Sequence, residues 1–340
     1  MIGTIEVSTR RDAPWLVRLA LAVVACASVF SLLAWVYELG SFAFWGAFVS
    51  APLVVLLIVV AVWLGQSAQW PGTRAAIVAG ALGGFVGTLG YDFFRVPFIY
   101  LGGYRLLAPI ESYGVLLLDA ETSTPLTDFV GWSYHFANGI GFGVAYAVVM
   151  RGRDWRWAIL WGLFLESAVV FSPFANTYGL VTDNEVKWAP IAIAYAAHVP
   201  YGIAVGLAAQ RSEAVTAEAV RALRYPVAAT VVTVLVVLAV WHRPLLADGA
   251  VDRGLAVAAG PSAIILDGEF QPTWLRVAVG GCATVENGDE ATVALSTGET
   301  LAAGARVELC GEEAGVHRVR VDEGEFSGGW LIVDPSLPRP

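Results

Sequence analysis

The sequence predicts an α-helical polytopic membrane bundle of about seven spans, followed by a small extracytoplasmic β-sandwich. Three observations carry this prediction: apolar segments of membrane-spanning length, arginines concentrated in alternate loops, and a change in charge near residue 245. Hydrophobic residues make up 57% of the 340 residues and charged residues only 14%. This balance is typical of chains that cross a membrane repeatedly.

The predicted spans follow from length, because a helix that crosses the bilayer needs about 20 apolar residues. Seven segments approach or exceed this length: 15–37, 42–64, 76–99, 129–150, 157–177, 189–210 and 226–242. The last contains the run PVAATVVTVLVVLAVW, which has no charged residue. The chain thus divides into a seven-helix membrane domain (1–245), a linker of small residues (246–261) and an outer domain (262–340).

Arginines predict the orientation, because cytoplasmic loops of membrane proteins are rich in Lys and Arg. The N-terminus and the loops after spans two, four and six carry these residues: Arg10, Arg11, Arg74, Arg151, Arg153, Arg156, Arg211, Arg221 and Arg224. The long opposite loop at 100–128 has only Arg105. We therefore expect a multi-pass protein of the cell membrane, with its N-terminus inside and residues 246–340 outside.

Two segments allow a second interpretation. The sequence VVAC at 23–26 resembles a signal-peptide cleavage site, although Arg18 interrupts the apolar stretch and apolar residues continue beyond Cys26. The 100–128 loop is unusually apolar. It is expected either to fold back onto the bundle as a cap or to form a plain surface hairpin.

Four ionisable side chains lie inside predicted spans, where they are costly and are functional candidates by default. They are Asp92, His135, Glu166 and His198, one on each of four spans. At about 1.5 Å per helical residue, all four fall between the bilayer midplane and the outer surface. Two His with one or two carboxylates form the ligand set of many metal sites, so one hypothesis is an iron, copper or haem site here.

Nearby residues extend this hypothesis. Asn138, Tyr201 and Arg95 are expected to support the four candidate ligands. Glycines recur at four-residue steps in the same spans, as in Gly139 with Gly143 and Gly202 with Gly206. Small residues at this spacing allow helices to approach closely.

Other functions remain open for the same residues. The bundle is a transporter or channel-like protein if they pass protons or a solute, and a non-catalytic anchor for an outer interaction domain if they only pack. Asp92 and Arg95, three residues apart, also suit simple mutual neutralisation. The sequence contains no Walker loop, CxxC, HExxH or GxSxG motif, so it predicts no catalytic residue.

The outer domain is acidic. Residues 246–340 contain 15 Asp and Glu against 6 Arg, which accounts for the net charge of −9 and argues against binding nucleic acid. The expected partners are the lipid bilayer and an extracytoplasmic protein. Cys282 and Cys310 are expected to form a disulfide worth about 3–4 kcal/mol, with two buried free thiols as the alternative.

Short alternating strands predict a sandwich, and one stretch resembles a known family. Phe270-Gln-Pro272 leads into a strand, a second strand ends in Asn287-Gly-Asp289, and Gly328-Gly329 precedes a final apolar strand. This pattern over residues 269–334 is similar to a cupredoxin domain. The resemblance implies a two-sheet β-sandwich.

The copper site of that family does not carry over. Type 1 copper needs two His, a Cys and usually a Met. The chain has EATVAL after Asp289 and RVDEGEFS between Val319 and Gly328, where the resemblance would place these ligands. His317 is the only histidine of the domain. We therefore expect a structural or docking module without type 1 copper.

Overall fold

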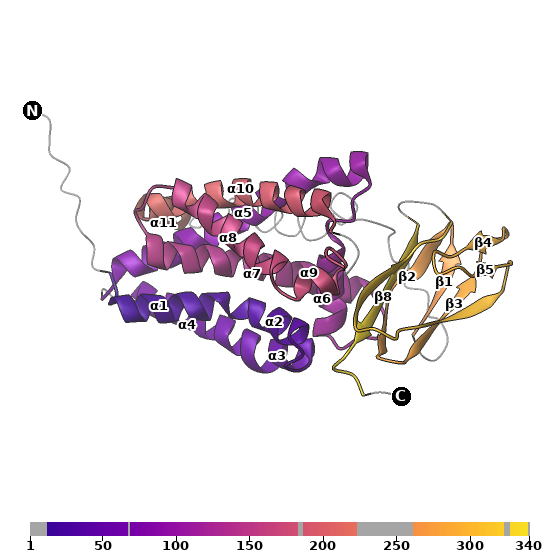
Figure 1. Ribbon diagram of the computed structural model, residues 1–340. Helices are drawn as coiled ribbons and strands as arrows, with labels where there is room; N and C mark the ends of the chain where they lie inside the picture. Colours follow the sequence, from indigo (N-terminus) through magenta and orange to yellow (C-terminus); the bar gives the residue numbers. More distant parts are fainter. Residues whose placement is uncertain (1–11, 67–68, 183–185, 223–260, 323–326, 339–340) are drawn as a thin grey trace, which may run out of the picture.

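The computed structural model describes five stretches of the chain: 12–66, 69–182, 186–222, 261–322 and 327–338. Its N-terminal region is helical and its C-terminal region is a curled mixed β-sheet, and the two lie end to end (Figure 1). Four helical segments are long and apolar enough to cross a membrane: Trp15–Val36, Phe42–Leu64, Pro71–Gly102 and Trp188–Gln210. The predicted span at 226–242 and most of the linker lie outside the described stretches.

The first two spans are helices with irregular turns. Their elements are α1 (Trp15–Ala25), a 3-10 turn (Cys26–Val29), α2 (Phe30–Val36), α3 (Phe42–Trp45), a π-helical turn (Gly46–Ser50) and α4 (Ala51–Gln66). Buried hydroxyls join the two spans where they are irregular. Ser31 Oγ lies 2.7 Å from Ser50 Oγ, which donates to the Ala27 carbonyl at 2.8 Å.

The remaining long helices run in alternating directions, and short helices lie at some of their ends. They are α5 (Pro71–Gly102), α6 (Ala108–Leu117), α7 (Pro125–Met150), α8 (Arg156–Val170), α9 (Phe174–Thr177), α10 (Trp188–Gln210) and α11 (Ser212–Ala222). Thr124 and Thr127 form a capping box at the start of α7. The fifth predicted span, 157–177, is not one helix. α8 ends at Val170, just before Pro173, a residue that disfavours helical backbone in its predecessor.

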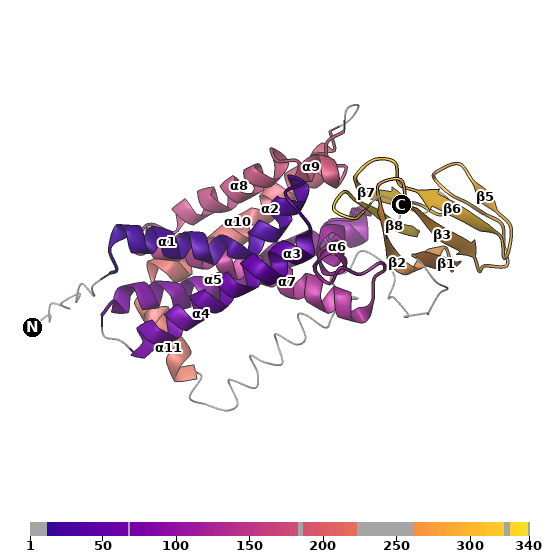
Figure 2. The same ribbon diagram turned by 90° about the horizontal axis from the view of Figure 1, so that it is seen from below.

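The long helices give the bundle two distinct ends. α2, α6 and α9 lie toward the sheet, and α11 and the start of α1 lie at the far end (Figures 1 and 2). Arg18 on α1 binds the last turn of α7 near the far end, donating to the carbonyls of Val148 at 2.6 Å and Val149 at 2.5 Å. Arg151 pairs with Asp12 there at 2.8 Å.

Glycines bring α5 against α7 with backbone in contact. A Cβ atom added at Gly84 would strike the Gly139 carbonyl and would lie 2.8 Å from Ile140 Cα. The same crowding holds for Gly80, where an added Cβ would lie 2.7 Å from Val144 Cα. The four-residue glycine spacing in the sequence therefore corresponds to a close helix–helix contact.

The substitution Gly84→Ala is expected to lower the free energy of unfolding by about 1–3 kcal/mol, since the surrounding backbone must move. The matched control is Gly90→Ala on the same helix, where the nearest atom to an added Cβ is 3.5 Å away. It is expected to be neutral or slightly stabilising, because Ala is the better helix former. Equal thermal unfolding curves for both variants in detergent would contradict this packing.

The C-terminal domain has a six-stranded mixed sheet in the order β6-β3-β1-β2-β8-β7 and a separate β4-β5 pair. The strands are β1 (Ser262–Leu266), β2 (Glu269–Ala278), β3 (Cys282–Asn287), β4 (Val293–Ala294), β5 (Thr300–Leu301), β6 (Arg306–Cys310), β7 (Gly315–Val319) and β8 (Gly328–Asp334). β1–β3 and β2–β8 are parallel pairs, and the other pairs are antiparallel. Because the β2–β8 register shifts between Glu269 and Trp274, β2 pairs with β1 over its first half and with β8 mainly over its second.

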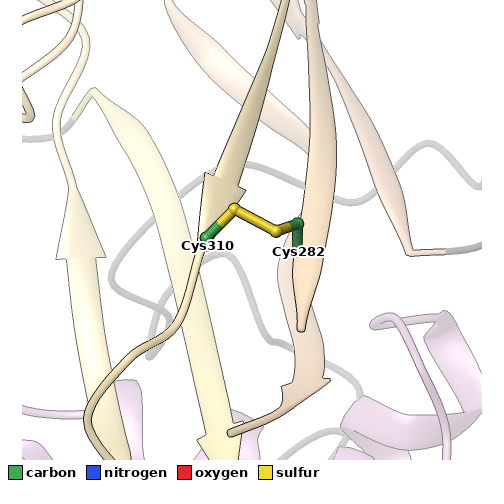
Figure 3. The surroundings of a disulfide bond; sticks show 2 residues. All are labelled: Cys282 and Cys310. Carbon is green, nitrogen blue, oxygen red and sulfur yellow. A yellow bond between two sulfur atoms is a disulfide. The ribbon is translucent and has the colours of Figure 1, made fainter. Parts of the chain in front are cut away.

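A disulfide joins the strands at one edge of this sheet. Cys282 on β3 and Cys310 on β6 face each other across the antiparallel pair, with sulfurs 2.05 Å apart (Figure 3). The bond closes a loop of 28 residues. This is the pairing that the sequence predicts.

The sheet and the bundle share one apolar core. The cluster contains Trp274 and Ile332 of the sheet together with Trp35 and Phe42 of the first two spans. The segment 100–128 takes part in it as a cap, because α6 is buried between the bundle and the sheet. A surface hairpin, the alternative for this segment, is therefore wrong.

Candidate functional site

The four candidate residues lie on four helices that pack against one another. Asp92 is on α5, His135 on α7, Glu166 on α8 and His198 on α10. Asp92, His135 and His198 are each ten residues from the end of their helix nearer the sheet, or about 15 Å. Glu166 is four residues from its end. All four are therefore in the half of the bundle that faces the sheet.

Asp92, His135 and Arg95 form the first group. His135 Nε2 lies 3.1 and 3.2 Å from the two Asp92 carboxylate oxygens, and Arg95 Nη2 lies 2.9 Å from Asp92 Oδ1. Asp92 has no exposed surface and Arg95 is 5% exposed. Because a guanidinium is always charged, it favours the ionised carboxylate, which then accepts a hydrogen bond from a proton-bearing Nε2 of His135.

Glu166 and His198 form the second group. His198 Nδ1 lies 2.9 Å from the Ala194 carbonyl and 3.5 Å from Glu166 Oε2. A carbonyl only accepts, so Nδ1 carries the proton and Nε2 of a neutral ring is free to accept one. The side chains of Glu166 and His198 are 5% and 14% exposed. A second buried imidazole thus contacts a second buried carboxyl group.

Tyr91 lies between the two groups, and the sequence did not point to it. Its ring centroid is 4.7 Å from that of His198 and 6.1 Å from that of His135. The Arg95 guanidinium carbon lies 4.2 Å from the same ring centroid. An aromatic residue in an apolar span gives no functional signal by itself, and only its position beside Asp92 draws attention to it.

The three residues that were predicted to support the site make different contacts. Arg95 contacts a candidate residue directly, as described above. The Tyr201 hydroxyl instead donates to the Gly139 carbonyl at 2.8 Å and so ties α10 to α7. In the described stretches no hydrogen bond joins Asn138 to His135, and Asn138 Oδ1 is buried without a partner.

The donor atoms form two pairs rather than one set of ligands. Within the described residues, no three of the candidate donors come within 4.8 Å of one another. The group that meets this criterion there is Cys282, Glu308 and Cys310 in the sheet, and its two sulfurs are already joined. Each of the two imidazoles is therefore placed beside one carboxyl group.

Comparison of the chain with protein-family models, with curated proteins and with solved structures finds no match. The function must therefore be argued from the site itself.

Proposed function

We propose that this chain is a proton-conducting protein of the cell membrane, with seven spans, a cytoplasmic N-terminus and an extracytoplasmic C-terminal domain. The observation that carries the proposal is the pair of buried imidazole–carboxyl contacts, Asp92–His135 and Glu166–His198, with Tyr91 against both rings. Chains of Asp, Glu and His inside membranes commonly relay protons.

The two imidazole–carboxyl pairs are suited to different steps of proton transfer. Asp92 is neutralised by Arg95 within hydrogen-bonding distance, so its negative charge is fixed. Glu166 and His198 together are neutral whether the exchangeable proton is on the Glu166 carboxyl or on Nε2 of His198, because Nδ1 keeps the proton that it donates to the Ala194 carbonyl. We therefore assign the loading and release of the proton to Glu166 and His198. Asp92 orients His135, whose imidazole receives the proton.

The two ends of the bundle support this topology. The last described helix, α11, lies at the end of the bundle opposite the sheet (Figures 1 and 2), and Arg151 pairs there with Glu213 of α11. The proposed topology needs one more crossing between α11 and β1. The apolar run at 226–242 is long enough for that seventh span.

For the outer domain we propose a cupredoxin-like sandwich without copper. The support is the mixed sheet with two parallel pairs and a strand, β2, that pairs with different neighbours along its length. His317, on β7, is exposed, and its Nε2 lies 2.9 Å from the Glu313 carbonyl. The outer domain is expected to act on the bundle through direct contact and not through a bound metal.

The test is proton flux in sealed liposomes that contain the purified chain and an internal pH-sensitive dye, driven by a potassium diffusion potential. Glu166→Gln is expected to reduce flux at least tenfold, because an amide cannot exchange the proton. The matched control is Glu213→Gln, a half-exposed carboxylate that pairs with Arg151 on α11's side of the bundle. It is expected to leave flux unchanged.

Two outcomes would reject the proposal. One is wild-type flux in Glu166→Gln. The other is stoichiometric iron, copper or haem in the purified protein that disappears in the His135→Ala/His198→Ala variant, which would establish a metal site instead.

A further inference from the structure

We propose that residues 103–124 form an outer gate over the Asp92–His135 pair, and that strand β2 of the sheet holds this gate closed. The inference rests on the proposed function, since it assigns a control to the same site. It depends on three sets of contacts, which run from the site through the gate to the sheet.

The inner contact is made by Arg95. Its Nη2 binds Asp92, and its Nη1 donates to the Leu106 carbonyl at 2.7 Å, so one guanidinium joins the site to the gate. The next gate residue, Leu107, is fully buried in the same apolar cluster as Trp132 and Phe136. These two rings contact His135, with centroids 5.9 and 5.8 Å from the imidazole centroid.

The middle of the gate is α6, which lies directly on α7. A Cβ atom added at Gly114 would strike the Thr127 carbonyl, and one added at Gly131 would lie 3.0 Å from the Gly114 nitrogen. Most of α6 is buried, including the Glu111 carboxylate, which is 6% exposed. The gate therefore closes the α7 side of the site toward the sheet.

The outer contact is made by β2. Glu111 Oε2 accepts from Trp274 Nε1 at 2.9 Å. Ser123 and Trp274 exchange hydrogen bonds at 3.0 and 3.1 Å, and the Arg276 amide donates to the Glu121 carbonyl at 2.8 Å. The end of the gate is thus attached to β2 by an antiparallel bridge between Thr122 and Leu275.

One ion pair reinforces this attachment at its accessible edge. Arg276 Nη1 lies 2.7 Å from Asp119 Oδ1, and the Asp119 side chain is 61% exposed. The other side of the Arg276 guanidinium binds Asp334 of β8. Because the sheet reaches the gate through hydrogen bonds and this ion pair, a shift of the sheet would draw the Leu106 carbonyl away from Arg95.

The test measures access to the site from outside. His135→Cys is introduced in a Cys26→Ser background, and a membrane-impermeant maleimide is added to intact cells. Labelling is expected to be slow with an intact gate. It is expected to be at least tenfold faster when Arg276→Gln is added, because the guanidinium that holds Asp119 is then lost.

The matched control is Arg306→Gln, which removes an exposed ion pair with Glu286 in the same domain but away from the gate. Two further variants serve if Arg276→Gln does not fold: Asp119→Asn, and Trp274→Phe, which removes the indole donor to Glu111 but keeps an aromatic ring against Trp330. Both are expected to speed labelling, and Arg276→Lys is expected to restore slow labelling in part.

Equal labelling rates in the gate variants and in Arg306→Gln would overturn the gate. Labelling does not require proton flux, so the two proposals fail separately. Equal rates together with Glu166-dependent flux would retain the proton pathway and reject its control by the sheet.

Discussion

Replacement of Asp334 by Ala is expected to destabilise the protein by about 3–5 kcal/mol, the cost of leaving a buried charge without its partner. Asp334 is fully buried where the sheet meets the bundle. Its carboxylate accepts from Trp35 Nε1 at 3.1 Å and from Arg276 Nε and Nη2 at 2.8 and 2.6 Å. It also accepts from the amide and hydroxyl of Ser336 at 2.8 and 2.7 Å. Without it, Arg276 remains buried with Asp119 alone.

Denaturant unfolding followed by tryptophan fluorescence would measure this loss, because Trp35 and Trp274 both lie in the affected core. The matched control is Glu286→Ala, which breaks the exposed pair with Arg306 and is expected to cost about 0–1 kcal/mol. If Asp334→Ala lowered the free energy of unfolding no more than Glu286→Ala, the contacts that Asp334 makes between sheet and bundle would add nothing to stability.

Asp92→Ala is expected to cause a loss of similar size, about 3–5 kcal/mol, inside the bundle. The substitution removes the carboxylate that lies 2.9 Å from the Arg95 guanidinium, a residue only 5% exposed, and it removes the partner of His135 Nε2. The double variant Asp92→Ala/Arg95→Ala is expected to lose less than the sum of the two single losses. The difference would be about 0.5–3 kcal/mol, as for other residues in direct contact.

Unfolding by SDS titration in mixed micelles would provide these values. Asp154→Ala is the control, since it removes an exposed 3.7 Å pair with Arg156 and one hydrogen bond to the Arg156 amide at the start of α8, and it is expected to cost only about 1 kcal/mol. Strict additivity of the Asp92 and Arg95 losses would show that the two charges do not interact.

The sequence predicts the height of each polar residue in the bundle but not its partner. Distance along a helix is set by the rise per residue, so counting residues from the span ends is enough to place His135 and His198 in the half of the bundle that faces the sheet. Which carboxylate each contacts depends on how four helices rotate and which ones touch. Hydropathy contains no information on the rotation of the helices or on which helices touch.

The junction between the domains is harder to predict for a related reason. Glu111 and Asp119 lie in the segment 100–128, which the sequence predicts only as a loop, and their partners Trp274 and Arg276 are 163 and 157 residues later, so no local periodicity relates them. A buried acid in a loop is indistinguishable from a solvated one until its partner is known. Local rules work better for the pair Cys282 and Cys310, whereas the end of α8 at Val170 was missed because hydropathy extended the predicted span to residue 177.

The hydrogen bonds from Arg18 to the last turn of α7 imply an order in which the helices assemble. Its partner carbonyls are 130 and 131 residues further along the chain, so they are synthesised long after the first span has left the ribosome. Until then the guanidinium must remain among lipid headgroups, where water can solvate it. We therefore expect α1 to reach its final position only after α7 has been synthesised, so that a chain truncated before Val148 would hold α1 loosely.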